Sequence, residues 1–308
     1  MILALSLNTA LDKTLVLKRL KPGTRHIPEH SLDLAGGKGV NAARALHRLG
    51  MRPRVLGFLA SHTGRHIRAL LAEEGLPADW VELPSGESRT CITLNHGAAS
   101  PTEVNEAGPR VPPDCIRRLE TLFMKRLSGC RFVLLCGRLP PGVPPGFYAK
   151  LIRAAKSRGV PCALDASEPA LSRGLRAGPD IAKPYRVEMA ELGLPVGPAS
   201  WKASLSRLAR LGAREVFATL GQDGALMLTP AGVLHAVAPK VADGCPIGSG
   251  DTFLAGLVYG KLKGYPPERR LSFATALASA SVRTLGAGVF RKEHLRRALA
   301  SIRLRTLH

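Results

Sequence analysis

Short runs rich in apolar and β-branched residues alternate along the chain with stretches whose apolar positions recur at helical spacing. The strand-like runs are 2–7, 54–59, 132–137, 162–166, 216–221 and 225–229, and the helical stretches lie at about 39–49, 63–74, 113–127, 145–157, 200–210, 250–262 and 267–284. This alternation predicts βαβ units and a mainly parallel sheet with helices on both faces. Ligands of such sheets bind beyond the carboxyl ends of the strands. Asn8, Gly137, Asp165 and Gly221 fall at those ends.

Two segments interrupt the alternation. Residues 13–34 and 88–106 contain short extended runs between turn signals, and neither is followed at once by a helical stretch. They are expected to pair as a small separate sheet, which would serve as a lid or a dimer surface. Because no long polar linker divides the chain, residues 1–308 are predicted to form a single domain.

Composition indicates a globular protein and gives no sign of a secreted or membrane-spanning one. The chain has 308 residues, 45% of them hydrophobic, and six cysteines without C-x-x-C spacing. Its N-terminal apolar run reaches Asn8 after seven residues and is interpreted as a buried strand, not a signal peptide. No apolar run of membrane-spanning length is found, so no membrane partner is expected. Reduced cysteines and the missing signal indicate a cytoplasmic protein.

The net charge of +21 first suggests nucleic acid as a partner. The 44 lysines and arginines are scattered along the chain, however, and aromatic residues amount to only 5%. Few side chains could therefore stack on single-stranded bases, and nucleic acid is not the expected partner. A positive field would also attract a small anionic substrate.

The stretch AGGKGVNAARALHRLG (35–50) places Lys38 between glycines at the start of a helix. It is not a P-loop, because Gly39 follows the lysine and Leu32 stands where the first glycine would be. A helix N-terminus and a lysine nevertheless favour an anion. The alternative is a flexible turn with a solvated lysine.

The stretch PIGSGDTFLAGLVYGKLKG (246–264) places Asp251 in the first turn of another helix, after Gly248, Ser249 and Gly250. Backbone N–H groups there would form an anion-binding nest. Asp251 would be either a helix-capping carboxylate or the base that accepts the proton of a hydroxyl during phosphoryl transfer. The helix terminus is expected to depress its pKa, so that Asp251 stays ionised at neutral pH.

These residues resemble motifs of the ribokinase-like (PfkB) carbohydrate kinases. Besides the two glycine stretches, the similar segments in family order are LNTALD (7–12), TEVNEAGP (102–109), CGRLPPGV (136–143), KPYRVE (183–188) and TLGQDGAL (219–226). The resemblance implies a three-layer α/β/α fold with a small β lid. It also implies an ATP-dependent phosphosugar kinase that converts a ketohexose phosphate to a bisphosphate.

Lys38 favours the branch of 1-phosphofructokinase and tagatose-6-phosphate kinase, because the minor 6-phosphofructokinase usually has glycine there. D-fructose 1-phosphate is the first candidate substrate. Tagatose 6-phosphate, fructose 6-phosphate and an unphosphorylated sugar or nucleoside remain alternatives. A regulatory or RNA-binding protein on a kinase scaffold is the alternative outside the enzymes, and the presence of Asp251 argues against it.

The resemblance implies roles for individual residues. Asp251 would be the base, with Gly248, Ser249 and Gly250 as the anion hole. The substrate-binding residues would be Asp12, Gly37, Lys38, Asn41, Arg89 and Arg138. On the nucleotide side would lie Lys183, Glu188, Gly221 and Gly224. ATP and Mg²⁺ are the expected cofactors, with Glu188 holding the metal through water. A homodimer through the β lid is the expected assembly, since the lid would leave strand edges exposed.

Three positions depart from the family pattern. Tyr185 stands where the family usually has asparagine, Cys245 replaces a residue ahead of the glycines, and Thr9 replaces proline. A tyrosine cannot supply the donor and acceptor pair of an amide. Donor preference or magnesium contacts are therefore expected to differ at Tyr185, whereas the predicted base and anion hole are intact.

Overall fold

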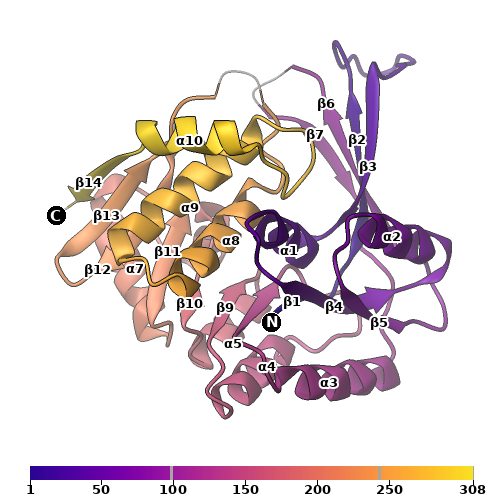
Figure 1. Cartoon of the computed structure of the whole chain (residues 1–308), viewed down its shortest axis with the longest axis horizontal. Helices are drawn as coiled ribbons and strands as arrows, with labels where there is room; N and C mark the ends of the chain where they lie inside the picture. The colour runs from indigo at the N-terminus through magenta and orange to yellow at the C-terminus, as the bar shows by residue number, and fades with distance from the viewer. Residues whose placement is uncertain (98–99, 242–243, 308) are drawn as a thin grey trace.

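The main sheet crosses the whole body of the molecule (Figure 1). The computed structural model describes residues 1–97, 100–241 and 244–307, and within them this sheet has ten strands. In spatial order they are β14 (Arg303–Leu307), β13 (Gly232–Val237), β12 (Ala225–Thr229), β11 (Glu215–Thr219), β10 (Ile181–Ala182), β9 (Cys162–Asp165), β8 (Phe132–Cys136), β1 (Ile2–Ser6), β4 (Pro53–Leu59) and β5 (Ala78–Glu82). The seven strands from β5 to β11 pair in parallel, and the last three pair antiparallel.

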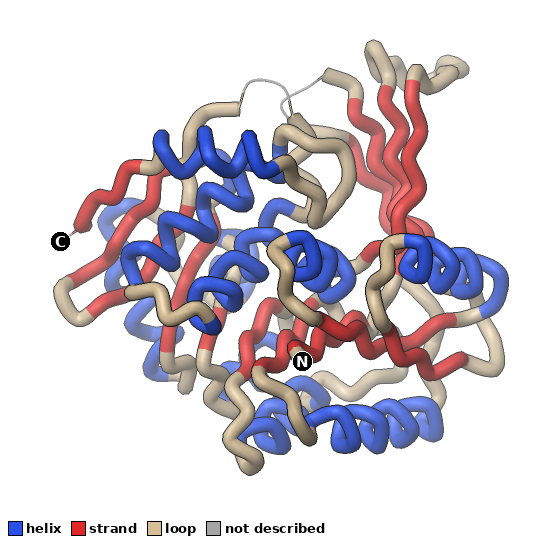
Figure 2. The backbone as a smooth tube through the Cα atoms, in the orientation of Figure 1, coloured by secondary structure: helices blue, strands red, loops and turns tan. Residues whose placement is uncertain are grey.

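Helices cover both faces of this sheet, as the alternating pattern predicts (Figure 2). One face packs against α3 (Pro113–Leu127), α4 (Phe147–Lys156), α5 (Ala170–Arg176), α6 (Arg186–Glu191) and α7 (Trp201–Arg210). The other packs against α1 (Lys38–Arg48), α2 (Ser61–Glu73), α8 (Ser249–Leu262), α9 (Pro267–Val282) and α10 (Lys292–Ser301). In the described ranges, no helix is long and apolar enough to cross a membrane.

The burial of each element follows its sequence pattern. All five residues of β1 are buried, which matches its continuous apolar run between two helical layers. Helix α8 is apolar nearly all round because it lies between α1 and α9. By contrast, α1 carries its two basic C-terminal residues, His47 and Arg48, at its exposed end.

The six strand-like runs and seven helical stretches expected from the sequence are all present. Elements that the pattern did not reveal are mostly short: β10 has two residues, α6 has six and α5 has seven. Segments of that length contain too few turns or alternations to show a period. Strands β5, β13 and β14 and helix α10 were also missed; α10 lies in the basic tail, where apolar residues keep helical spacing.

Residues 13–34 and 88–106 contribute to a second sheet that projects from the body (Figure 1). Its order is β3 (His30–Gly36), β2 (Ala10–Val16), β6 (Arg89–Asn95) and β7 (Thr102–Asn105). Residues 98–99 of the second segment lie outside the described part of the chain. The small sheet is thus present where the extended runs suggest it, and its role as a lid stays a prediction.

The connections single out one edge of the main sheet. Strand β1 lies between β4 and β8, so the chain runs to opposite sides of β1 in successive crossovers. At such a switch point the loops after the strands separate and leave room for a ligand. Segments leaving the carboxyl ends of β8, β10 and β11 contain Arg138, Lys183, Glu188, Gly221 and Gly224.

Candidate active site

The glycine run before α1 permits a close approach between the helix and the end of β1. Gly37 is the N-cap of α1 with φ 103°, and a Cβ there would lie 2.7 Å from the Ser6 hydroxyl. A Cβ on Gly39 would overlap the backbone of Leu5. The first turn of α1 therefore lies directly against β1, which no larger residue at these positions would allow.

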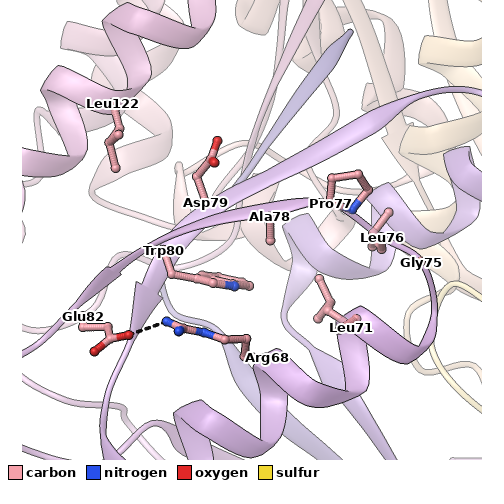
Figure 3. A pocket seen from close by; sticks show the side chains of 11 residues that line it. Arg68, Leu71, Gly75, Leu76, Pro77, Ala78, Asp79, Trp80, Glu82 and Leu122 are labelled. Atoms are coloured by element: carbon pink, nitrogen blue, oxygen red, sulfur yellow. Dashed lines mark hydrogen bonds and ion pairs between the residues drawn. The ribbon is translucent and has the colours of Figure 1, made fainter.

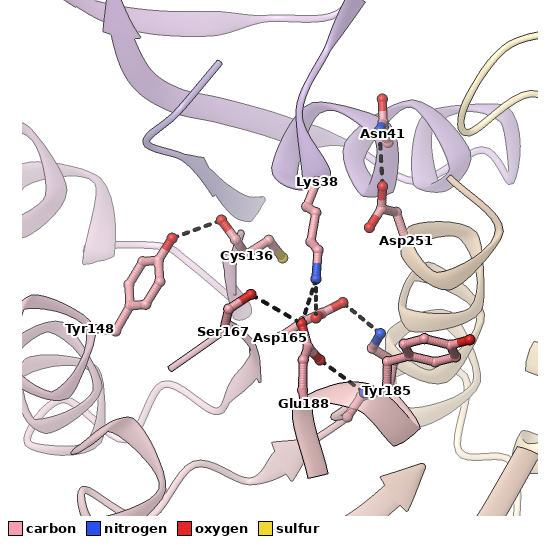
Figure 4. A network of polar contacts seen from close by, with 10 residues as sticks. Lys38, Asn41, Cys136, Tyr148, Asp165, Ser167, Tyr185, Glu188 and Asp251 are labelled. Atoms are coloured by element: carbon pink, nitrogen blue, oxygen red, sulfur yellow. Dashed lines mark hydrogen bonds and ion pairs between the residues drawn. The ribbon is translucent and has the colours of Figure 1, made fainter. Parts of the chain in front are cut away.

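Lys38, at the start of α1, is paired with two carboxylates of the protein (Figure 4). Its Nζ lies 2.9 Å from Asp165 Oδ1 and 3.1 Å from Glu188 Oε1. Burial disfavours the ammonium, but Asp165, Glu188 and Asp251 outweigh it and hold the pKa of Lys38 well above its usual value. The sequence assigned Lys38 to an anionic substrate. The structure gives it protein partners, and its role at the substrate stays a prediction.

Asp165 is the centre of this ionic network. It ends β9, is fully buried, and its Oδ2 lies 2.7 Å from Nζ of Lys183, which follows β10. Burial would raise the pKa of Asp165, but Lys183 and Lys38 outweigh it and the pKa is lowered. The sequence left Asp165 between a loop-ordering and a purely structural role. Its position at the end of a buried strand was the available signal.

Glu188 both caps α6 and joins the network. Its Oε2 accepts a hydrogen bond from the Tyr185 N–H at 2.9 Å, and its Oε1 accepts one from the Ser167 hydroxyl at 3.3 Å. Tyr185 is the N-cap of the helix, and its hydroxyl lies 3.8 Å from where a Cβ on Gly221 would stand. The tyrosine that departs from the family pattern therefore lies beside the predicted nucleotide turn.

Gly221 and Gly224 form the turn between β11 and β12. Their φ values are 68° and 94°, and a Cβ on Gly224 would overlap the backbone of Ala236. These left-handed conformations and the close approach explain why both positions are glycine. The turn lies at the carboxyl end of β11, on the same edge of the sheet as Asp165 and Lys183.

Asp251 lies in the first turn of α8 and is only 6% exposed. The helix begins after Gly248, which is left-handed with φ 73°, and a Cβ there would overlap Ala287. The Asn41 amide Nδ2 donates to Asp251 Oδ2 at 2.9 Å (Figure 4). A Cβ on Gly250 would lie 3.5 Å from Lys183 Nζ, so this lysine lies next to the helix N-terminus.

The expectation that the helix depresses the pKa of Asp251 is wrong. Burial raises the pKa to about 7, although Lys38, Asn41 and Lys183 lower it; Asp165 raises it further. A helix terminus stabilises a charge by only about 0.3 to 1 kcal/mol at typical sites, whereas complete burial can shift a carboxyl by several pKa units. Sequence reveals the helix start but not the depth at which the carboxylate lies.

Asp12 lies at the junction of the small sheet with the body. Gly36, on the adjacent strand β3, leaves space for the carboxyl group, which any Cβ at position 36 would overlap. Burial raises the pKa of Asp12 to about 6, against the opposing effect of Arg44 and Arg89. A carboxyl of this pKa is mostly ionised at neutral pH and can accept hydroxyl hydrogen bonds.

Asn8 and Arg89 extend this side of the site. Arg89 Nε donates to the Asn8 carbonyl at 3.0 Å, and Asn8 Nδ2 donates to the Ala107 carbonyl at 3.0 Å. Within the described residues, the buried Oδ1 of Asn8 has no hydrogen-bond partner, and it lies against Gly108, where a Cβ would come within 2.2 Å of it. Asn8 was noted only as a strand end in the sequence, without a role in binding.

Arg138 lies exposed in the loop after β8, next to Gly137. A Cβ on Gly137 would lie 3.7 Å from Lys38 Cβ, which brings this loop to the start of α1. No described hydrogen bond or ion pair connects the Arg138 side chain to the network of Lys38, Asp165 and Glu188. Its assignment to a substrate phosphate stays a prediction.

A separate hollow of about 690 Å³ lies beside edge strand β5 (Figure 3). It is lined by Arg68, Leu71 and Ala72 of α2, by residues 75–80 and Glu82, and by Leu122 of α3. It shares no residue with the network around Asp165 and Asp251. None of the predicted site residues lines this hollow.

Taken together, the geometry suits phosphoryl transfer. A helix N-terminus presents backbone N–H groups next to Asp251, a carboxylate poised near neutral pH, and Lys183 adds a cation. On the other side of Asp251 lies Asn41, which belongs to α1 and follows the glycine run at the start of that helix. Anion stabilisation together with one base is the minimum that transfer to a hydroxyl requires.

Comparison with known proteins agrees with this interpretation. Residues 11–293 match the family described as pfkB family carbohydrate kinase. The chain is 30% identical to 1-phosphofructokinase of Haemophilus influenzae over 291 residues, covering 94% of this chain and 93% of the relative. It superimposes on phosphofructokinase-2 from Escherichia coli in complex with substrates and products, with a TM-score of 0.87, 26% identity and coverage of 97% and 98%. A possible 1-phosphofructokinase from Thermotoga maritima gives a TM-score of 0.91 at 22% identity, over 100% of both chains, which supports the fold alone.

Proposed function

The chain belongs to the pfkB family of carbohydrate kinases, and we propose that it transfers the γ-phosphoryl group of ATP to D-fructose 1-phosphate. The family has the ribokinase-like fold and transfers phosphate to a hydroxyl, so fold and reaction class follow from membership. The observation that carries the finer proposal is Asp251, a buried carboxylate in the first turn of α8 with a pKa near neutrality.

In the proposed reaction, Asp251 accepts the proton of the acceptor hydroxyl as that oxygen bonds to the γ-phosphorus. The bond between the γ-phosphorus and the bridging oxygen of ADP breaks, so the products are fructose 1,6-bisphosphate and ADP. Backbone N–H groups of Gly248 and Gly250 face the charge on the transferred group, whereas the Ser249 N–H already donates to the Pro246 carbonyl at 3.1 Å. Their positions are fixed before the reaction because Gly248 packs against Ala287.

The sugar phosphate is proposed to lie between the small sheet and α1. Asp12 accepts hydrogen bonds from sugar hydroxyls. Gly37 and Asn41 line the same side, and the sugar phosphate is assigned to Lys38, Arg89 and Arg138. Guanidinium groups bind phosphate through paired N–H donors, which suits the two arginines.

The nucleotide is proposed to occupy the opposite side, above the Gly221–Gly224 turn, with Lys183 near its terminal phosphate. Both Glu188 oxygens already accept hydrogen bonds from the protein. Glu188 would therefore hold the family's Mg²⁺ through water and not by direct coordination. The metal would neutralise phosphate charge when bound. Asp165 keeps Lys183 in place, and Tyr185 borders the turn where the family usually has asparagine.

Fructose 1-phosphate is preferred among the candidates because several relatives at about 30% identity are named 1-phosphofructokinase. The lysine in the glycine run points to the same branch. Fructose 6-phosphate differs from it in the position of the phosphate, and tagatose 6-phosphate differs also in the configuration of one hydroxyl-bearing carbon. Choice among them depends on the reach of Lys38, Arg89 and Arg138.

The direct test is ADP release from ATP and Mg²⁺ with fructose 1-phosphate, tagatose 6-phosphate, fructose 6-phosphate, fructose and ribose. Asp251→Asn should lower kcat by roughly 10²- to 10⁴-fold. Asp114→Asn, at an exposed position of α3, makes the same chemical change away from the site and should be fully active. Higher kcat/KM on another sugar would replace the proposed substrate, and full activity of Asp251→Asn would refute the proposed base.

We also propose a cytoplasmic homodimer formed through the small sheet. On the face opposite Asp12, Leu15, Ile92, Leu94 and Val104 form an apolar surface, and Val104 is 57% exposed. Val104→Asp should convert the dimer to a monomer in sedimentation experiments. Leu299→Asp on α10 changes an exposed leucine elsewhere and should leave the mass unchanged. A wild-type monomer would contradict the proposal.

A further inference from the structure

Arg44 of α1 is a buried arginine whose every N–H group is used. The side chain is 2% exposed, and Nε and NH2 bind the two oxygens of Glu74 at 2.5 and 2.7 Å. NH2 also donates to the Ala35 carbonyl at 2.5 Å, and NH1 donates to the Ala287 carbonyl at 2.9 Å and to Asn41 Oδ1 at 3.2 Å. These contacts exhaust the five donors of a guanidinium.

The partners of Arg44 come from separate elements around the site. Ala35 lies in β3 where the small sheet joins the body, and Glu74 is the C-cap of α2. Ala287 lies in the loop against which Gly248 packs. Arg44 thus ties together α1, the base of the small sheet and the loop that supports the start of α8.

The contact with Asn41 has a specific consequence. A guanidinium has donors only, so it binds the oxygen of the Asn41 amide and turns the NH₂ group the other way. That NH₂ group donates to Asp251 Oδ2 at 2.9 Å. With the amide reversed, its oxygen would face a carboxylate oxygen, which is repulsive, and its NH₂ group would face the guanidinium.

We propose that Arg44 is a positioning residue for the phosphoryl-transfer reaction: it fixes the amide of Asn41, which in turn holds the Asp251 carboxylate towards the acceptor hydroxyl. The inference rests on Asp251 being the base. It adds a residue that touches neither substrate nor nucleotide. The sequence contained a signal, since Arg44 lies four residues after Val40 and therefore on the apolar side of α1.

A simply structural role is the alternative, because a buried ion pair that loses one partner destabilises a protein. The two roles separate in the pH dependence of the reaction. Asp251 is also faced by Lys38 from α1, by Asp165 from β9 and by Lys183 after β10, and none of these three is a hydrogen-bond partner of Arg44. The acid limb is the part of the pH profile in which kcat/KM falls as the pH is lowered. If this limb shifts in an Arg44 variant, the hydrogen bond from Asn41 to Asp251 has changed.

The experiment compares Arg44→Lys, Asn41→Ala and the double variant, each in the full chain. Lysine keeps the charge but cannot reach all five acceptors. Each single variant should lower kcat by roughly 10- to 100-fold and move the acid limb upward by about one pH unit, because Asp251 loses a donor. The double variant should show no further shift beyond Asn41→Ala. The titration of the sugar phosphate is common to all variants and cancels in the comparison.

Arg270→Lys is the matched control. Arg270 is 4% exposed, lies in α9 and pairs with Glu215 at 2.9 Å, away from Asp251. It should lower the thermal midpoint without moving the acid limb. If Arg44→Lys does not fold, Arg44→Met combined with Glu74→Met replaces the ion pair by apolar side chains, a change that often preserves stability.

An unchanged acid limb in folded Arg44 variants would overturn the inference, and so would a further shift in the double variant. Failure of both Arg44 variants to fold would assign Arg44 to folding and overturn it as well. These outcomes differ from failure of the proposed function, in which the wild-type protein transfers no phosphate to any sugar or Asp251→Asn keeps full activity.

Discussion

Asp251 combines two opposing influences on one carboxyl group. The helix N-terminus and the Asn41 amide favour its ionised form, whereas nearly complete burial disfavours it, and burial prevails. The result is a pKa of about 7, which suits a base at neutral pH because it is half deprotonated and still basic enough to accept a proton. Such a group is expected to lower the stability of the folded protein.

Stability should therefore depend on pH through Asp251. A carboxyl whose pKa is higher when folded binds a proton preferentially in the folded state, so the free energy of unfolding falls as pH rises from about 4 to about 7. Asp251→Asn removes this loss. Its thermal midpoint should exceed that of the wild type by roughly 5 °C at about pH 8 and by less at about pH 5. Scanning calorimetry of Asp251→Asn and Asp114→Asn would measure it, and an equal gain at both pH values would contradict the explanation.

The catalytic rate should also depend on the ionisation of Asp251, but it should rise with pH, whereas stability falls. Because only the ionised carboxylate accepts a proton, kcat/KM should fall about tenfold per pH unit below an acid limb near pH 7. Steady-state rates between about pH 5.5 and 9 would define the limb. A limb near pH 4 would mean that Asp251 is not the perturbed base, or that another step limits the rate.

Residue identities alone could predict the candidate base but not its environment. The GSGD sequence indicates a helix start with an aspartate in its first turn, and the structure has both. The partners of Lys38, however, lie 127 and 150 positions away in sequence. Nothing local to residue 38 reveals that Asp165 and Glu188 will meet it, and burial of Asp251 likewise arises from elements that are distant in the chain.

At the scale of elements, the start of α8 depends on one glycine. Gly248 has a left-handed conformation and leaves no space for a Cβ beside Ala287. Gly248→Ala should cost about 1 kcal/mol in backbone strain, with a further loss from the overlap. Because the N–H groups of the proposed anion hole would move with the helix start, kcat should fall at least about 100-fold.

Gly129→Ala provides the control for this prediction. Gly129 also has a left-handed φ, 74°, but no atom lies within 4 Å of the added Cβ. It should show the backbone strain in denaturant unfolding without a change in kcat. If Gly248→Ala lost no more activity than Gly129→Ala, the start of α8 would not be the anion hole.

Element prediction succeeded where a segment is long and periodic. The pattern of 113–127 gave α3 with both bounds correct, since fifteen residues contain four turns of alternating exposed and buried positions. Strand β10 could not be recognised, because it has only two residues and is defined by its pairing with β9 and β11, not by a pattern in its own sequence. The short capped helix α6 is likewise defined by Tyr185 and Glu188 more than by any apolar period.

At the scale of the whole molecule, the net charge of +21 should act on the encounter with anionic substrates. Surface charges attract a sugar phosphate over distances that salt screens, so KM should rise by roughly tenfold between about 0.05 and 0.5 M potassium chloride. The value of kcat, set after binding, should change much less. Steady-state kinetics in a salt series, with sucrose as an uncharged control, would test this, and a salt-independent KM would show that the charge has no part in capture.

The overall architecture was the most predictable level. Alternating strand and helix patterns lead to a parallel sheet between two helical layers, and the extended runs lead to the small sheet. Strands β13 and β14, and the antiparallel pairing of β12 with its neighbours, were less accessible, because strand order is decided by pairing between distant segments. The position of the candidate site depends on this strand order, because the order determines which strand ends lie next to one another.

The pairing of Lys38 with Asp165 and Glu188 has a consequence for discrimination between substrates. If Lys38 binds the phosphate of the sugar, that phosphate must first displace two carboxylates. These act as an internal competitor, always present at fixed concentration, for every ligand that binds through Lys38. A phosphate dianion can compensate for the loss of these contacts, whereas a neutral hydroxyl cannot. The network would thus exclude unphosphorylated sugars by holding the lysine, not by blocking the pocket.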